Sequence, residues 1–125
     1  MGYLQSDYGY ISKLGQFFIP KAMQDKSQIR AAKGDLITIV QCELEEGHIL
    51  LKHYKTVAKS EHKEIQQEKE GLRAVDELGR VILSKQYRDA LDISDNAILV
   101  SYLIDDATIK IRPLVMQHST GSEIA

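Results

Sequence analysis

The hydrophobic residues of this chain are grouped in short runs that are rich in β-forming side chains and are separated by Gly, Pro, Asp or Asn. This pattern is typical of strands joined by turns. It predicts strands over residues 8–11, 16–19, 36–40, 48–52, 72–75, 80–83, 97–103 and 108–112. Pro20 and Ser84 each stand at a favourable helix start, so a short helix is expected after each of them. The pattern therefore predicts a mostly β protein with short helices.

The predicted elements occur twice in the same order. Residues 10–21 recur as residues 74–85, and at this constant spacing Leu14-Gly15 and Leu78-Gly79 each form a turn between two strands. Each glycine is expected at a positive φ, and each leucine is expected to help close the core. One such unit is too small to bury a core of its own, so the two units must pack together.

The repeat divides the 125 residues into four segments. Residues 1–55 are the first unit, and residues 72–113 are the second. Residues 56–71 form a polar, partly helical connector, because Lys and Glu dominate them. Residues 114–125 are expected to be a flexible tail.

The composition argues against several classes of protein. No apolar run reaches membrane-spanning length, and no basic and apolar leader begins the chain, so a cytoplasmic location is expected. Cys42 is the single cysteine, and its apolar surroundings predict a buried thiol without a disulfide partner. No phosphate loop or nucleophile motif is present. The histidines lack metal-ligand spacing; they are His48, His53, His62 and His118. We therefore expect no metal, no cofactor and no enzymatic activity.

Residues 72–82 read Leu-Arg-Ala-Val-Asp-Glu-Leu-Gly-Arg-Val-Ile. This run closely resembles the start of the AbrB/SpoVT family of prokaryotic DNA-binding domains (SpoVT-AbrB domains). The resemblance covers residues 72–113 well and residues 8–55 more weakly. It implies a swapped-hairpin, double-psi-like β-barrel formed from two tandem β-β-α-β-β units. Closure within one chain is favoured over exchange between two chains, because the connector keeps the two units at high effective concentration.

The resemblance also implies which residues contact DNA. Arg73, Arg80 and Arg88 match arginine positions of the family, although Asp89 reverses the charge of a second helix arginine. Three lysines are candidates for additional contacts: Lys85, Lys13 and Lys21. In the first unit, the three arginine positions hold other residues, which are Gly9, Gln16 and Gln24.

Arginine suits this role because its planar fork donates two parallel hydrogen bonds to phosphate or guanine. The resemblance thus implies a transcription regulator that binds double-stranded DNA through its second unit. A patch of only three arginines predicts weak to moderate affinity and a shallow salt dependence, and the net charge of −2 does not by itself indicate nucleic-acid binding. In a competing interpretation, the arginines pair with acidic neighbours on a solvated face. Arg80 is expected to do so least, because its turn directs it outward.

Two other functions remain open. The related MazE-type antitoxins use the same frame and present a tail to a toxin, although the tail after Pro113 is short here. Alternatively, the degenerate first unit serves as a scaffold or oligomerisation surface that binds no DNA. A homodimer is a further possibility, since functional sites of this kind often need two patches. No membrane partner is expected.

Overall fold

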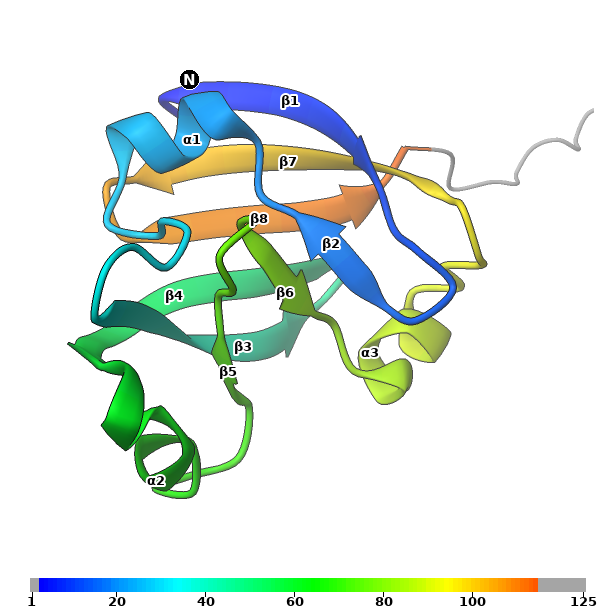
Figure 1. The fold of residues 1–125 in the computed structure, drawn as a ribbon. Coiled ribbons are helices and arrows are strands. Elements are labelled where there is room, and N and C mark those ends of the chain that lie inside the picture. Colours follow the sequence, from blue (N-terminus) through cyan, green and yellow to red (C-terminus); the bar gives the residue numbers. More distant parts are fainter. Residues whose placement is uncertain (1–2, 115–125) are drawn as a thin grey trace, which may run out of the picture.

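The computed structural model describes residues 3–114. In chain order the first elements are β1 (Gln5–Tyr10), β2 (Gln16–Phe18), α1 (Lys21–Lys26), β3 (Leu36–Glu45) and β4 (His48–Ala58). A 3-10 turn (Lys59–Glu61) and α2 (His62–Gln66) follow. The last elements are β5 (Leu72–Ala74), β6 (Arg80–Ile82), α3 (Lys85–Ala90), β7 (Ile98–Asp105) and β8 (Thr108–Pro113). The order strand–strand–helix–strand–strand occurs on both sides of α2 (Figure 1).

The mostly β architecture with short helices is confirmed, but the closed barrel is not. Six strands form an open antiparallel sheet in the order β1-β7-β8-β4-β3-β5, and β2 and β6 form a separate two-stranded ribbon. The sheet therefore has two edges, β1 and β5. Closure would require hydrogen bonds between these edges, and β5 is only three residues long.

The strands of the two halves are interleaved. β1 pairs with β7 and β5 pairs with β3, while β2 pairs with β6 and β4 pairs with β8. The ribbon is centred on Phe17 opposite Val81, which are equivalent residues of the repeat. The outer strand pairs follow the same relation. Gly9 of β1 lies opposite Leu99 of β7, and its counterpart Arg73 of β5 lies opposite Val40 of β3. The two halves are thus related by an approximate two-fold axis through the middle of the ribbon.

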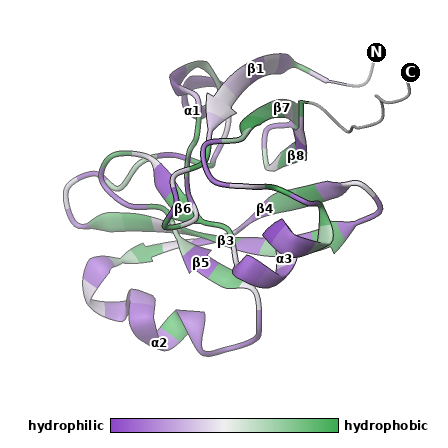
Figure 2. Ribbon diagram, turned by 90° about the vertical axis from the view of Figure 1, so that its right-hand side faces the viewer, coloured by the Kyte–Doolittle hydropathy of each residue, from purple (hydrophilic) through white to green (hydrophobic). Residues whose placement is uncertain are grey.

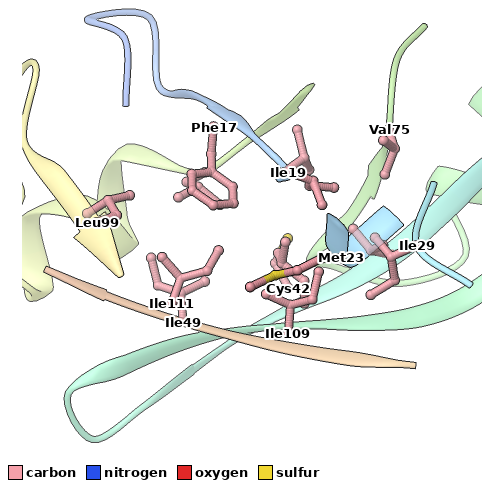
Figure 3. Close-up of a cluster of buried hydrophobic side chains, with 14 of the residues drawn as sticks. Phe17, Ile19, Met23, Ile29, Cys42, Ile49, Val75, Leu99, Ile109 and Ile111 are labelled. Carbon is pink, nitrogen blue, oxygen red and sulfur yellow. The ribbon is translucent and has the colours of Figure 1, made fainter. Parts of the chain in front are cut away.

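The core lies between the ribbon and the six-stranded sheet. Phe17 of β2 and Ile19, which follows β2, point toward Ile49 of β4 and toward Ile109 and Ile111 of β8 (Figure 3). All five side chains are buried. Burying apolar surface of this kind is the main favourable contribution to folding.

Two expectations about the core have different outcomes. Cys42 is buried as predicted. By contrast, the expectation that Leu14 and Leu78 close the core is wrong, because their side chains are 71% and 63% exposed. Both lie at the tips of the turns, where the chain projects away from the packed layers.

The chain between the halves lies outside the core. Residues 56–71 contain the end of β4, the 3-10 turn and α2. Helix α2 is mostly hydrophilic (Figure 2) and buries none of its residues. No helix within residues 3–114 is long and apolar enough to cross a membrane. Apart from Leu114, the predicted tail lies outside the described residues.

Candidate nucleic-acid interface

The turn between β5 and β6 is organised by one carboxylate. Asp76 Oδ1 accepts hydrogen bonds from the backbone N–H groups of Leu78 and Arg80, both at 2.9 Å. Gly79 has the predicted positive φ, 80°, and its N–H donates to Asp76 O. A side chain that accepts from the backbone two residues ahead is the usual device for closing such a turn.

The turn between β1 and β2 has the same geometry with a different side chain. Ser12 Oγ accepts from the N–H groups of Leu14 (3.2 Å) and Gln16 (3.1 Å). Gly15 has a φ of 85°, which confirms the second glycine prediction. The backbone of the turn therefore does not depend on whether its first residue is acidic.

Asp76 has a second oxygen available, and Arg80 binds it. Arg80 Nε donates to Asp76 Oδ2 at 2.6 Å, and the guanidinium lies 5.8 Å from the ring centre of Phe18, the residue opposite it in the ribbon. Arg80 thus lies on the outer face of the ribbon, but the expectation that it would be the least paired arginine is wrong. Among the described residues, it is the one arginine of the three that forms an ion pair.

The pKa of Asp76 is held below its ordinary value by these contacts. Partial burial alone raises the pKa of this carboxyl. The hydrogen bonds from the backbone and side chain of Arg80, and from Leu78, outweigh that effect. Asp76 is therefore a carboxylate at neutral pH, and it fixes the base of the Arg80 side chain.

Arg88 connects α3 to the turn of the other half. Its Nε donates to Leu83 O at 3.0 Å, and a Cβ placed on Gly15 would lie 3.0 Å from its Nη2. Leu83 in turn donates its N–H to Gly15 O at 2.8 Å. The guanidinium thus packs against the first turn, and this contact was not predicted from the sequence.

Gln24 makes the equivalent contacts in the first half. Its Nε2 donates to Ile19 O at 2.9 Å, and it packs against Gly79 of the second turn. The two side chains occupy the same position of the repeat. The sequence does contain a signal that these two side chains make equivalent contacts, because the constant spacing of the repeat aligns Gln24 with Arg88.

Arg73 lies on β5, beside the start of α3. It is half-buried and lines a hollow of about 240 Å³ with six other residues; these are Cys42, Glu70, Gly71, Ser84, Gln86 and Tyr87. Tyr87 packs against the core, and its hydroxyl donates to Cys42 O at 3.3 Å.

The candidate lysines are exposed, and two of them form ion pairs within their own helices. Lys85 pairs with Asp89 at 2.9 Å, and Lys21 pairs with Asp25 at 3.1 Å. Exposed pairs of this kind contribute little and exchange readily with other partners. Lys13 is exposed at the first turn.

The three arginines are not gathered in one hollow. Arg80 lines a separate hollow of about 600 Å³ that also contains Lys59 and Glu77, which form their own ion pair at 2.6 Å. Arg73 and Arg88 lie at α3 instead. The structure therefore places positive groups along the ribbon and α3 rather than in a single cluster.

The described residues contain no group of three or more His, Cys, Asp and Glu side chains that could hold a metal ion. His118 lies outside them. In comparisons with known proteins, no protein-family model, no curated protein and no solved structure matches this chain.

Proposed function

We propose that this chain is a DNA-binding transcription regulator of the AbrB type that contacts double-stranded DNA through Arg73, Arg80 and Arg88. In this proposal, the two halves are interleaved units of a swapped-hairpin fold. The interleaving of strands from the two halves in the sheet supports that arrangement, as does the repeated turn geometry.

One observation carries the functional part of the proposal. Gln24 makes the same hydrogen bond and the same glycine contact as Arg88, and the turn before Gln16 has the same backbone bonds as the turn before Arg80. A neutral side chain therefore makes the structural contacts at the position of Arg88, and the backbone bonds of the turn form without a guanidinium at the position of Arg80. Arg80 adds one partly exposed ion pair with Asp76, a kind of contact that contributes little to stability, and guanidinium groups are the residues of choice for phosphate recognition.

The expected binding is electrostatic and moderate in strength. Acidic side chains accompany the cationic ones, and the net charge of the chain is −2. Each neutralised phosphate contributes about 0.9 to the slope of log affinity against log salt concentration. Three arginine contacts therefore predict a slope near −3 and affinity that is lost at high salt.

The repeat itself supplies the test. The double variant R80Q/R88Q gives the second half the residues that the first half already tolerates, so its unfolding midpoint should stay close to that of the unmodified chain. Its affinity for random duplex DNA should fall by at least about tenfold, measured by fluorescence anisotropy at low salt. The reverse variant Q16R should raise the affinity; Gln24 is kept, because its Oε1 accepts from Ala31 N at 2.8 Å and arginine has no acceptor.

The control variant K63Q/K69Q removes the same charge from the exposed connector and should retain binding. The proposal fails if R80Q/R88Q binds DNA as the unmodified chain does. It also fails if the control loses as much affinity, because the effect is then one of net charge alone.

A second candidate function is a protein-interaction module, either an antitoxin-like frame or an oligomerisation scaffold. Phe18 and Ile82 are both 49% exposed and are diagonal neighbours on the outer face of the ribbon. Exposed apolar groups that adjoin one another are typical of interfaces. If the ribbon is such an interface, F18S/I82S should convert an oligomer to a monomer in light scattering, whereas L4S/L44S, which alters exposed leucines elsewhere, should not.

A further inference from the structure

The first half carries a feature that breaks the two-fold relation. The link between α1 and β3 (residues 27–35) is longer than the corresponding link between α3 and β7 (residues 91–97). The additional residues do not form a loose loop. Gln28 N donates to Asp106 O at 2.7 Å, and Ile29 is fully buried in the core.

The link holds a guanidinium in a fixed place. Ser27 is buried, and its Oγ accepts from Ile29 N at 3.1 Å. Its carbonyl oxygen accepts from Arg30 Nε at 2.6 Å. This bond anchors the base of the Arg30 side chain and leaves its terminal nitrogens able to bind a ligand, because Arg30 forms no ion pair with the described residues.

The link forms one wall of an open groove of about 720 Å³, between α1 and the β3–β4 hairpin. Three cationic side chains line it: Lys21, Arg30 and Lys33. Asp25 is the one carboxylate of the lining, and it is paired with Lys21. The groove is therefore positive, although the chain as a whole is negative.

The remaining lining suits an organic molecule. Ala31, Ala32 and Leu36 give it an apolar part, while Thr38 and Thr56 provide hydroxyl groups. The volume of the groove lies within the range of small-molecule sites, and its largely polar lining suits a charged ligand. A rigid duplex would reach the exposed lysines but not the hydroxyl of Thr38, which is buried.

We propose that this groove binds a small organic phosphate of about the size of a nucleoside monophosphate. Arg30 and Lys33 bind the phosphate, and the apolar wall contacts the organic part. The site belongs to the first half and does not depend on the DNA-binding function proposed for the second half.

The test uses the complete chain and three probes: adenosine monophosphate, inorganic phosphate and adenosine. The first two should shift backbone amide NMR signals of residues 24–33 and 53–56, and adenosine should bind at least about tenfold more weakly than adenosine monophosphate. R30Q/K33Q should weaken adenosine monophosphate binding by at least about tenfold. Both side chains are exposed, but R30Q removes the bond from Arg30 Nε to Ser27 O. The unfolding midpoint is therefore measured beside binding, and a folded variant that still binds adenosine monophosphate as tightly overturns the proposal.

The variant K63Q/K69Q, with the same change in net charge, should bind adenosine monophosphate as the unmodified chain does. The proposal is overturned if adenosine binds as tightly as its monophosphate, or if the two double variants lose equal affinity. It is also overturned if duplex DNA shifts these amides and adenosine monophosphate does not. R80Q/R88Q should leave the groove unaffected, which separates this site from the DNA interface.

Discussion

Gly71 and Gly47 have similar positive φ angles but differ in the space around them. Gly71 has a φ of 88°. A Cβ on it would lie 2.7 Å from the backbone oxygen of Cys42 and 2.5 Å from the side-chain nitrogen Nε2 of Gln41. Gly47 has a φ of 78°, and a Cβ on it would meet nothing within 4 Å. Alanine substitutions at these two glycines therefore separate the free-energy cost of a left-handed backbone from that of steric crowding.

We predict that G47A lowers the free energy of unfolding by about 1–2 kcal/mol, the cost of a left-handed conformation. G71A should lower it by a further 1–3 kcal/mol or so, because the neighbouring carbonyl belongs to the backbone and cannot move aside cheaply. Urea denaturation of both variants measures the difference. Equal losses would show that the sheet edge yields to the added methyl group.

The contribution of Asp76 to its turn can be tested with a serine substitution, because Ser12 closes the equivalent turn of the first half. D76S should retain the two backbone hydrogen bonds, whereas D76A should lose them and about 1–2 kcal/mol of stability. Urea unfolding at neutral pH compares the two variants. A D76S loss as large as that of D76A would contradict this role.

The same carboxylate makes stability depend on pH. Its pKa is lower in the folded than in the unfolded chain, so its contribution is complete above the ordinary pKa of Asp, about 3.9. The contribution is lost as the pH falls through the folded-state pKa. Acidification below about pH 4 should therefore cost the unmodified chain more stability than D76S, as measured by thermal unfolding across a pH series.

At the scale of elements, the two helices begin differently. Ser84 Oγ accepts from Tyr87 N at 3.3 Å at the start of α3. Pro20 stands at the start of α1 without a side-chain cap, and its φ of −56° is close to the −62° of Ser84. A proline therefore fits the backbone at residue 84.

We predict that S84A destabilises the chain by about 1 kcal/mol through loss of the cap. S84P should cost less than S84A, because proline restricts the unfolded chain by an amount that offsets the lost hydrogen bond. Urea denaturation ranks the variants. If S84P is the more damaging of the two, the two helix starts are not equivalent.

The elements were largely predictable from the sequence, because β-forming runs and turn residues are local signals. The predicted ends of β3 and β4 were too early. Residues 41–45 of β3 pair with residues 48–52 of β4, and residues 53–58 of β4 pair with residues 36–40 of β3, so each extension depends on the cross-strand partner rather than on its own hydrophobic pattern. The exposure of Leu14 and the contact between Arg88 and Gly15 could not be predicted in this way. Each depends on where the other half of the chain lies.

At the scale of the molecule, the two halves share one sheet. Four strand pairs join the halves, while the chain between β4 and β5 contains only α2 and the short 3-10 turn as regular elements. The covalent link is therefore not what holds the folded halves together.

A protease site inserted between Gln67 and Glu68, both exposed, should allow the chain to be cut without falling apart. The two pieces should elute together in size-exclusion chromatography under native conditions and separate only in urea. The uncut insertion variant, which should elute at the same volume, is the control. Separation under native conditions would show that the shared sheet is weaker than its pairing indicates.

The approximate two-fold axis between Phe17 and Val81 lies within a single polypeptide. In an assembly of two identical subunits, every substitution is present on both sides of the axis. Here a change at Gln24 leaves Arg88 as it was, so the two sides can acquire different chemistry while they keep a common frame. The two sides of such a molecule are not identical, so it can distinguish the two ends of whatever it binds.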